Sequence, residues 1–420
     1  MDKTADIYID GGFALAGDVR ASGAKNSALK LMAASILAPG ATCIGNVPMI
    51  SDVRVMGQVL ATLGAGVQFG DSSVNLDTST IASCVAPTEL VSQMRASIAV
   101  LGPLVGRFGQ AKVAIPGGCR IGERPLDMHY SALEALGAEF SWDEQYIYAS
   151  TPRGLRGASV TLGFPSVGAT ENLMMAAVLA QGQTQIANAA REPEIADLAD
   201  YLNGMGAKIT GAGSADITIE GVAGLQPVAA HRTIGDRIEA GTFLMAGALL
   251  GGPVCVHGID PSHLATVLAK LGQMGAEVTV GEDCISVSCH QRLRPADIQT
   301  LPFPGFATDL QAPAMVLTCL AQGRSVVAEN IFEDRFLHVT ELAKMGANIR
   351  IDGRFAHIEG VQTLHGATVE VRDLRGGAAL VLAGLAAEGY TIVTDTGFIE
   401  RGYEGLISKL QSLGAQIRRV

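Results

Sequence analysis

The sequence predicts an α/β protein built from six similar units, grouped as two domains of three units each. Three observations lead to this fold class. A Gly-Ala pair preceded by Leu or Met recurs at intervals of 68 to 73 residues, and an apolar helix followed by glycine and a strand stands upstream of most pairs. The chain of 420 residues is also longer than one hydrophobic core usually serves.

The repeat contains both helical and strand patterns. The Gly-Ala pairs begin at residues 64, 137, 206, 275, 346 and 414, and amphipathic helices are expected ahead of them, as over 198–205 and 342–345. Alternating segments behind most pairs predict hairpins, as at 209–219 and 349–358. The upstream segments, such as LMMAAVLAQG and LVLAGLAAEG, predict a buried helix capped by glycine and followed by a strand. Each unit is therefore a small α/β subdomain.

The boundary between the two halves is only weakly marked. The stretch 231–236, which follows the hairpin of the third unit, is the best single candidate. A cleft between two such halves is the default place for a small-molecule ligand.

The composition restricts the partners of this chain. It has 48% hydrophobic residues, 17% charged residues and a net charge of −11, so neither nucleic acid nor an anionic membrane is expected as a partner. The N-terminal residues contain no apolar signal core. Glycines and a proline interrupt the uncharged run 240–257, which predicts a buried helix turning into a strand and no membrane span.

Cysteine usage indicates a reduced, cytoplasmic protein. The seven cysteines, at 43, 84, 119, 255, 284, 289 and 319, are odd in number and lack a close-spaced framework. Cys284, Cys289 and His290 lie in an alternating strand pattern without the four-ligand spacing of zinc sites. No metal is expected there.

A glycine-proline loop, 116–129, contains the most distinctive cysteine. Arg120 and Arg124 flank Cys119, so a lowered thiol pKa and an affinity for phosphate or carboxylate are expected. The alternative is a small apolar residue in a glycine turn. Pro125 is placed to begin a helix in which His129 is more simply explained by a structural hydrogen bond than by proton transfer.

Two further segments present candidate polar groups. Ser22–Ser27 opens a helix with Lys25 in its first turn, either as an anion site or as an ordinary helix start. Asp309 ends a proline-stiffened loop, where spacing alone favours a helix cap and a general base is the alternative. Arginines that can bind phosphate or carboxylate recur where the loops of the repeats are expected to meet: Arg95, Arg335, Arg375 and Arg401.

Together these motifs resemble the enolpyruvyl transferase family, in its UDP-N-acetylglucosamine 1-carboxyvinyltransferase branch. The resemblance covers essentially the whole chain, and the cysteine loop distinguishes this branch from the shikimate-3-phosphate transferases. The motifs stand at 22–26, 116–127, 166–170, 188–194, 236–242, 306–309 and 401–404.

The resemblance implies the enolpyruvyl-transferase fold, with three βαβαββ units around buried helices in each of two domains. Residues 1–21 and 234–420 would form the C-terminal domain and 22–233 the N-terminal domain, with the active site in the interdomain cleft. The implied protein is a cytoplasmic monomer or weak homo-oligomer that needs no metal or organic cofactor.

The implied reaction is the first committed step of peptidoglycan synthesis. The enolpyruvyl group of phosphoenolpyruvate moves to the 3-hydroxyl of UDP-N-acetylglucosamine by addition and elimination, with release of phosphate. Shikimate 3-phosphate as acceptor, or a non-catalytic UDP-sugar-binding homologue, are the alternatives. The latter is disfavoured because Lys25, Cys119, Asp309 and Arg401, the residues implied for catalysis, are all present.

The resemblance also assigns roles to individual residues. Asp309 would take the proton of the sugar hydroxyl, and Cys119 would deliver a proton to C3, form a covalent phospholactoyl adduct and react with the antibiotic fosfomycin. Phe164 replaces a lysine of many relatives, which puts one nucleotide phosphate contact in doubt. Phosphoenolpyruvate would meet Lys25, Asn26, Arg124, Arg375 and Arg401. UDP-N-acetylglucosamine would meet Arg95, Arg124, Pro125, Leu126, Asp127, Met128, Ser166, Val167, Gly168, Asp309 and Ile331.

Overall fold

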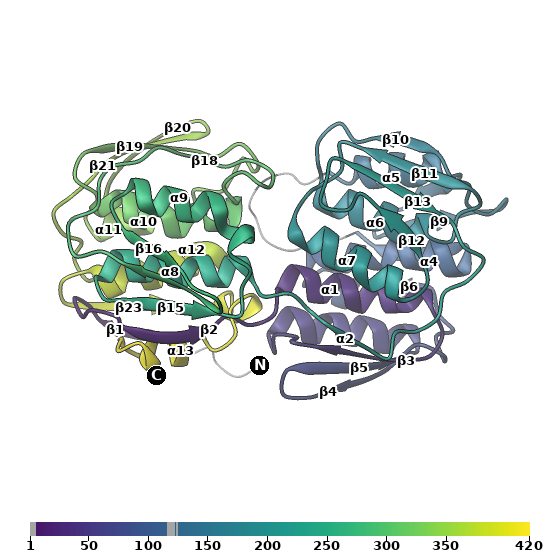
Figure 1. The fold of residues 1–420 in the computed structure, drawn as a ribbon, viewed down its shortest axis with the longest axis horizontal. Helices are drawn as coiled ribbons and strands as arrows, with labels where there is room; N and C mark the ends of the chain where they lie inside the picture. The colour runs from purple at the N-terminus through teal and green to yellow at the C-terminus, as the bar shows by residue number, and fades with distance from the viewer. Residues whose placement is uncertain (1–5, 116–121, 123–124) are drawn as a thin grey trace. The chain divides into compact units, whose positions relative to one another are not determined.

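The computed structural model describes residues 6–115, 122 and 125–420, so Cys119, Arg120 and Arg124 lie outside the described residues (Figure 1). The chain forms two compact units. Unit 1 comprises the described residues up to Ser22, Gly122, and 235–420; unit 2 comprises the other described residues of 23–234.

The described strands form six four-stranded sheets, three in each unit, and each sheet follows one plan. In the sheet β10-β11-β13-β12, β10 runs parallel to β11, β13 lies antiparallel to β11, and β12 forms a hairpin with β13. One helix follows β10 and another follows β11, which gives the order βαβαββ. The elements are β10 (Ser159–Thr161), α6 (Val167–Ala177), β11 (Gln183–Ala187), α7 (Pro193–Gly204), β12 (Lys208–Thr210) and β13 (Asp216–Glu220).

The other two sheets of unit 2 are β14-β3-β5-β4 and β6-β7-β9-β8. The first is built with α1 (Lys25–Ala34), η1 (Ser35–Leu37), β3 (Ala41–Gly45), α2 (Ser51–Leu63), β4 (Gly66–Phe69), β5 (Ser73–Asp77) and β14 (Ala230–Arg232). The second is built with β6 (Val85–Ala86), α3 (Thr88–Val91), η2 (Arg95–Val100), α4 (Leu101–Phe108), β7 (Gln110–Ala114), α5 (Asp127–Ala135), β8 (Glu139–Trp142) and β9 (Tyr146–Ser150).

Unit 1 contains the sheets β16-β17-β15-β2, β18-β19-β21-β20 and β22-β23-β1-β24. The first is built with β2 (Gly17–Arg20), α8 (Arg237–Leu250), β15 (Val254–His257), η3 (Pro261–Leu264), α9 (Ala265–Gln273), β16 (Glu277–Val280) and β17 (Cys284–Ser288). The second is built with β18 (Ile298–Gln299), η4 (Thr308–Leu310), α10 (Gln311–Leu320), β19 (Arg324–Ala328), α11 (Val339–Lys344), β20 (Asn348–Asp352) and β21 (Phe355–Glu359). The third is built with β22 (Thr368–Glu370), α12 (Leu374–Ala386), β23 (Tyr390–Thr394), η5 (Ile399–Arg401), α13 (Leu406–Ser412), β24 (Gln416–Arg419) and β1 (Ile7–Asp10).

The sheets are closed by strands from distant parts of the chain. β1 lies between β23 and β24, and β2 pairs in parallel with β15, so both strands belong to unit 1. β14 returns late in the sequence to pair with β3 in unit 2. The chain passes between the two units at 22–23 and at 234–235. Within unit 1, Asp236 N–H donates to the Ser22 carbonyl at 2.8 Å, and within unit 2, Ala24 N–H donates to the Ile234 carbonyl at 2.7 Å.

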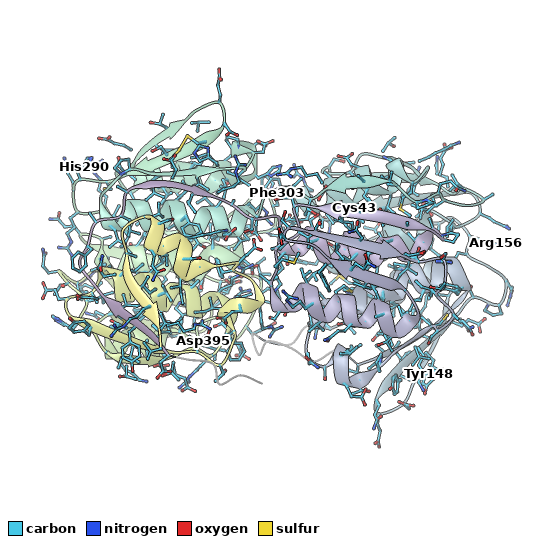
Figure 2. All side chains as sticks on the ribbon, turned by 90° about the horizontal axis from the view of Figure 1, so that it is seen from below. Cys43, Tyr148, Arg156, His290, Phe303 and Asp395 are labelled. Carbon is cyan, nitrogen blue, oxygen red and sulfur yellow. A yellow bond between two sulfur atoms is a disulfide. The ribbon has the colours of Figure 1, made fainter. Side chains whose placement is uncertain are left out.

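Buried helices form the centre of each unit, as the apolar segments predict. In unit 1, α8, α10 and α12 contact one another and are buried over almost their whole length. In unit 2, α6 packs against α4, α5 and α7, and α1 packs against α2 and α7. A helix that is apolar all round is stable only inside a core. Side chains of both units are drawn in Figure 2. The six-unit α/β fold class is confirmed.

The repeated glycine has a physical cause. Gly64, Gly137, Gly206, Gly275, Gly346 and Gly414 have φ between 93° and 107°, each at the end of the helix that precedes a hairpin. A residue with a Cβ rarely adopts this left-handed conformation, so glycine is required where the helix turns into the next strand. The second recurring glycine is not the helix cap that the sequence predicts. α10 ends at a C-cap Ala321 in extended conformation, and Gly323, with φ of 134°, makes the turn two residues later.

One expectation about cysteine is wrong. Cys255 on β15 and Cys284 on β17 form a disulfide, with a Cα–Cα distance of 6.0 Å, so the cysteines are not all reduced. The pairing has no close spacing in the sequence, because it depends on the register of two antiparallel strands that places Cys284 opposite His257. Cys43, Cys84, Cys289 and Cys319 are free. The run 240–257 is a helix and a strand as expected, and none of the described helices is long and apolar enough to cross a membrane.

Candidate functional site

A buried charge cluster of unit 1 surrounds Asp309, in η4 just before α10. Arg335 Nη2 donates to Asp309 Oδ1 at 2.8 Å, and Arg375 Nη2 donates to Oδ2 at 2.9 Å. Burial alone raises the pKa of Asp309, but the positive charges of Arg375 and Arg335 outweigh it and hold the pKa well below its usual range. Asp309 is therefore an ionised carboxylate. Since neither η4 nor α10 has a side-chain cap, the helix-cap interpretation is wrong.

Arg375 is positioned by the start of α12. Asp373 caps this helix, because its Oδ1 accepts from the backbone N–H groups of Arg375 and Gly376, both at 3.0 Å. The Arg375 side chain is 3% exposed. Its Nε and Nη1 have no hydrogen-bond partner among the described residues. Buried guanidinium donors normally have acceptors, so each of these two nitrogens can donate to an anion.

A buried carboxylate, Glu329, holds Asp309 and Ile331 in one framework. Thr308 Oγ1 donates to Glu329 Oε2 at 2.9 Å, which fixes the residue next to Asp309. The backbone N–H of Ile331 and the hydroxyl of Thr300 both donate to Glu329 Oε1, at 2.8 and 2.9 Å. The loop after β19 and the start of α10 are therefore tied together, although 22 residues separate Asp309 from Ile331 in the sequence.

Arg401 lies at the end of η5, which packs against α12. Two residues later the buried ring of Tyr403 lies 5.1 Å from the guanidinium carbon of Arg375, and its hydroxyl is 3.0 Å from that of Thr242 on α8. The segment of Arg401 is thus anchored on the helices that position Arg375. Unit 1 contains four residues of the expected site, Asp309, Ile331, Arg375 and Arg401, and two of them, Asp309 and Arg375, are in direct contact.

In unit 2, Lys25 is the first residue of α1 and pairs with Asp52 of α2 at 2.7 Å. Its side chain is 11% exposed, and Asn26 beside it is half-buried. Ala24 at the N-cap provides no side-chain acceptor for the first turn. Gly23 is needed for packing, because a Cβ there would lie 1.5 Å from the carbonyl oxygen of Asn46. No side chain caps the start of α1, and the ammonium group of Lys25, paired with Asp52, lies in its first turn, an arrangement that favours an anion at this helix end.

The starts of α5 and α6 meet at His129. This buried imidazole lies 3.0 Å, through Nδ1, from Asn172 Nδ2 on α6. Asn172 also accepts from Gly102 N–H at 2.8 Å, so α4, α5 and α6 share one polar contact. A Cβ on Gly168 would lie 3.0 Å from His129 Cε1, which shows how closely the helices approach. The structural hydrogen bond expected for His129 is confirmed.

Several residues expected on the nucleotide sugar lie around this contact. Ser166 caps α6 by accepting from Ala169 N–H at 3.4 Å, and Val167 and Gly168 are half-buried in its first turn. Pro125 and Asp127 are exposed, whereas Leu126 and Met128 are half-buried against the core.

Arg95 begins η2, which packs against α6 and α1. Burial raises the pKa of Tyr130, on α5, and the positive charge of Arg95 opposes this shift, so Arg95 lies near α5 as well. The segments of Arg95, 125–128 and 166–168 are therefore neighbours within unit 2. Phe164, just before α6, is 40% exposed.

Some residues near these sites could not be identified from the sequence, and two expected site residues are not among those that the structure describes. Cys119 and Arg124 lie outside the described residues. Arg335 is noticed in the sequence only as one of several arginines, and nothing in its spacing pairs it with Asp309. His338 lies buried near Asp373 and Arg335; burial lowers its pKa to about 4, so this imidazole is neutral. Glu329 gives no sequence signal beyond a buried strand end.

Comparison with known proteins places the chain in a family. The family described as EPSP synthase (3-phosphoshikimate 1-carboxyvinyltransferase) matches residues 9–410. A UDP-N-acetylglucosamine 1-carboxyvinyltransferase 2 of Carboxydothermus hydrogenoformans is 52% identical over 99% of both chains. A UDP-N-acetylglucosamine 1-carboxyvinyltransferase 1 of Staphylococcus aureus is 50% identical over 100% of both.

Solved structures agree with this assignment. The enolpyruvyl transferase NikO from Streptomyces tendae is similar with a TM-score of 0.89 and 26% identity, over 99% of each chain. EPSP synthase from Acinetobacter baumannii shares the fold with a TM-score of 0.76, at 17% identity over 99% of each chain. The chain belongs to the EPSP synthase family of enolpyruvyl transferases, in the branch of the UDP-N-acetylglucosamine 1-carboxyvinyltransferases.

Proposed function

We propose that this chain transfers the enolpyruvyl group of phosphoenolpyruvate to the 3-hydroxyl of UDP-N-acetylglucosamine and releases phosphate. The support is identity of 48–52% over essentially full length with relatives that carry this name. Shikimate 3-phosphate is the weaker candidate acceptor, because structural likeness to EPSP synthase at 17% identity concerns the fold alone. The reaction is expected to take place in the cytoplasm, where peptidoglycan precursors are made.

The observation in this structure that best supports such chemistry is the buried anion-binding arrangement at Arg375. Its Nε and Nη1 have no partner among the residues described, and the same guanidinium already holds Asp309. Either nitrogen can donate to an oxygen of the phosphate or carboxylate of phosphoenolpyruvate, and the positive charge of the guanidinium strengthens such a bond. Arg401, on the segment anchored by Tyr403, would add positive charge. Preorganised cations of this kind stabilise the tetrahedral intermediate formed when the sugar hydroxyl adds to C2.

Asp309 would act as the base for that hydroxyl. In the ligand-free protein its lowered pKa makes it ionised but weakly basic. An anion at Arg375 competes with the carboxylate for the guanidinium, which raises the pKa of Asp309 when substrate is present. Binding and base activation are then coupled through one arginine.

The remaining roles follow from the resemblance and from the segments of unit 2. Lys25 and Asn26 at the start of α1 would bind phosphoenolpyruvate together with Arg124, and Cys119 would protonate C3. The nucleotide sugar would meet Arg95, Pro125, Leu126, Asp127, Met128, Ser166, Val167 and Gly168, with Ile331 and Asp309 from unit 1.

Phosphate release from phosphoenolpyruvate tests the proposal. The assay compares UDP-N-acetylglucosamine with shikimate 3-phosphate as acceptor, for the wild type, for Arg375→Met and for the control Arg354→Met on the exposed β20–β21 turn. We expect turnover with the UDP-sugar only, a loss of about 10²- to 10³-fold in Arg375→Met, and no change in the control. Turnover with shikimate 3-phosphate alone, or undiminished turnover in Arg375→Met, would contradict the proposal.

A further inference from the structure

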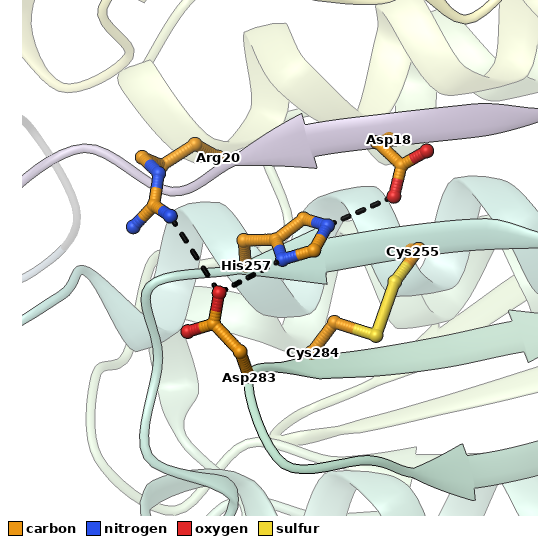
Figure 3. The surroundings of a disulfide bond; sticks show 6 residues. All are labelled: Asp18, Arg20, Cys255, His257, Asp283 and Cys284. Atoms are coloured by element: carbon orange, nitrogen blue, oxygen red, sulfur yellow. Dashed lines mark hydrogen bonds and ion pairs between the residues drawn. A yellow bond between two sulfur atoms is a disulfide. The ribbon is translucent and has the colours of Figure 1, made fainter.

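The outward face of the sheet β16-β17-β15-β2 gathers side chains that bind metals. Along β15, Val254 and Val256 are buried, whereas Cys255 and His257 point to the opposite face and are half-buried. Cys284 on β17 lies directly opposite His257 and shares this face. Figure 3 shows the cluster with Asp18, Arg20 and Asp283 around the imidazole.

Two cysteine sulfur atoms and an imidazole nitrogen lie close enough together to bind one ion. Cys255 and Cys284 form the disulfide, and their sulfur atoms and a ring nitrogen of His257 all lie within 4.8 Å of one another. Among the described residues, this is the one group of three or more Cys, His, Asp or Glu side chains with such geometry. The group lies in unit 1 on the sheet β16-β17-β15-β2. Ile331, a residue of the expected substrate site, follows β19 of a different sheet, β18-β19-β21-β20.

We infer that Cys255, Cys284 and His257 form a binding site for a thiophilic divalent cation such as Zn²⁺, open when the two thiols are reduced and closed when they form their disulfide. Two thiolates and one imidazole are donors that Zn²⁺ prefers, and water or a carboxylate completes a four-coordinate site. The side chains are half-buried and on a solvent-facing sheet surface, so an ion can enter without opening the core.

The surroundings of His257 suit a metal ligand. Its Nε2 lies 2.8 Å from Asp18 Oδ1, whereas Nδ1 lies 3.4 Å from Asp283 Oδ2. With Nδ1 on the ion, Nε2–H keeps its bond to Asp18, the carboxylate–histidine arrangement that orients many metal-bound imidazoles. Asp283 is 76% exposed and can supply an oxygen ligand. Arg20, 3.7 Å from Asp283, is 62% exposed and partly balances the added negative charge.

The two states are related by balanced reactions. On metal binding, each of the two thiols forms a sulfur–metal bond and loses one proton to solvent. On oxidation by a low-molecular-weight disulfide, the two thiolates lose two electrons and form the Cys255–Cys284 bond. The oxidant takes the two electrons and two protons, is cleaved into two thiols, and the ion is released. Disulfides in reducing compartments are usually transient or redox-sensing, which fits a site that alternates between these states.

Binding can be followed without reference to enzymatic activity. Full-length protein is reduced with a phosphine, freed of reductant under anaerobic conditions and titrated with Co²⁺, whose thiolate complexes absorb in the near ultraviolet. We expect one strongly bound Co²⁺ per chain, displaced by Zn²⁺, and no such binding after oxidation with glutathione disulfide. Native mass spectrometry should show the zinc adduct in the reduced protein, and the oxidised protein two hydrogens lighter without it.

Matched variants identify the ligands. Cys255→Ser and Cys284→Ser should each abolish the thiolate absorption, and His257→Gln should weaken binding about 10- to 100-fold. Cys43→Ser is the control, because Cys43 is also a half-buried cysteine on a strand, β3 of unit 2 (Figure 2), and should bind as the wild type does. Far-ultraviolet circular dichroism checks the fold of each variant.

Three outcomes would overturn the inference. One is reduced wild-type protein that binds no Co²⁺ or Zn²⁺, a result that does not depend on the folding of any variant. Another is binding that survives in folded Cys255→Ser and Cys284→Ser proteins. The third is binding that is equally strong in the oxidised protein.

Discussion

Replacing Asp309 by asparagine removes the charge that lies between two arginines while keeping the shape of the side chain. Arg335 and Arg375 are 5% and 3% exposed, and each donates to one oxygen of Asp309, at 2.8 and 2.9 Å. Removing one partner of a buried ion pair typically costs about 3–5 kcal/mol, because the other charge is left uncompensated. Since Asp309 is 25% exposed and asparagine keeps one acceptor, we expect the unfolding free energy of the ligand-free protein to fall by about 2–3 kcal/mol.

Thermal unfolding of the ligand-free protein measures this change. A loss of this size lowers the Tm by about 4–12 °C for a unit of this length. Asp352→Asn on β20 is the control, because that carboxylate is exposed and its replacement should change stability by less than about 0.5 kcal/mol. Inorganic phosphate should reduce the difference between Asp309→Asn and the wild type, since an anion at the arginines replaces the lost charge.

The same variant should lose about 10²- to 10⁴-fold in the rate of phosphate release, because the amide cannot take the proton of the sugar hydroxyl. The pH dependence has a definite sign. The folded pKa of Asp309 is lowered, so its contribution to stability is complete above the unfolded pKa of about 3.9 and is lost as the pH falls toward the folded value. An Asp309→Asn protein that is as stable as the wild type in the absence of phosphate would refute the charge-cluster reasoning. Near-normal turnover would refute the base assignment.

Three other predictions concern different parts of the chain. Gly168→Ala places a Cβ 3.0 Å from His129 and should raise the KM for UDP-N-acetylglucosamine about tenfold with little change in kcat; an unchanged KM would separate this helix contact from sugar binding. Burial raises the pKa of Glu171 from 4.5 to about 7, so its stabilising contribution is complete below pH 4.5 and declines toward pH 7; Glu171→Gln should flatten that part of the unfolding profile, and an unaltered slope would exclude Glu171 as its source. Fosfomycin should form one adduct, at Cys119, and phosphoenolpyruvate should suppress it in intact-mass and peptide analysis. Cys319 should stay unmodified, because burial raises its pKa to about 12, and adducts on several cysteines would contradict a single activated thiol.

The repeated architecture could be predicted from the sequence because local backbone demands leave local signals. Each Gly-Ala pair marks a helix end with φ near 100°, and each wholly apolar segment marks a helix that must be buried. The position of the turn after α10 could not be predicted in the same way. An extended Ala321 and a left-handed Gly323 share the task that the sequence pattern assigns to one glycine.

The candidate sites were predicted less completely, because they depend on contacts between distant residues. Asp309 meets Arg335 and Arg375 only after α10, α12 and the loop after β19 have packed, so spacing favours a simple cap. The Cys255–Cys284 pair depends on strand register for the same reason. The identities of the catalytic residues came from family resemblance, and those roles stay predictions.

The placement of β1 has a consequence for how the chain acquires its structure during synthesis. Ile7 and Ile9 are fully buried between β23 and β24, yet they are made first and their partners are made almost last. Unit 2 consists mainly of one continuous stretch and can fold while the ribosome is still translating unit 1. β1 therefore stays unpaired, with its apolar side chains exposed, until β23 and β24 have been synthesised and have left the ribosome. Such long-range pairing is slow to form, so nascent chains of this protein should depend on chaperones chiefly at their N-terminal end.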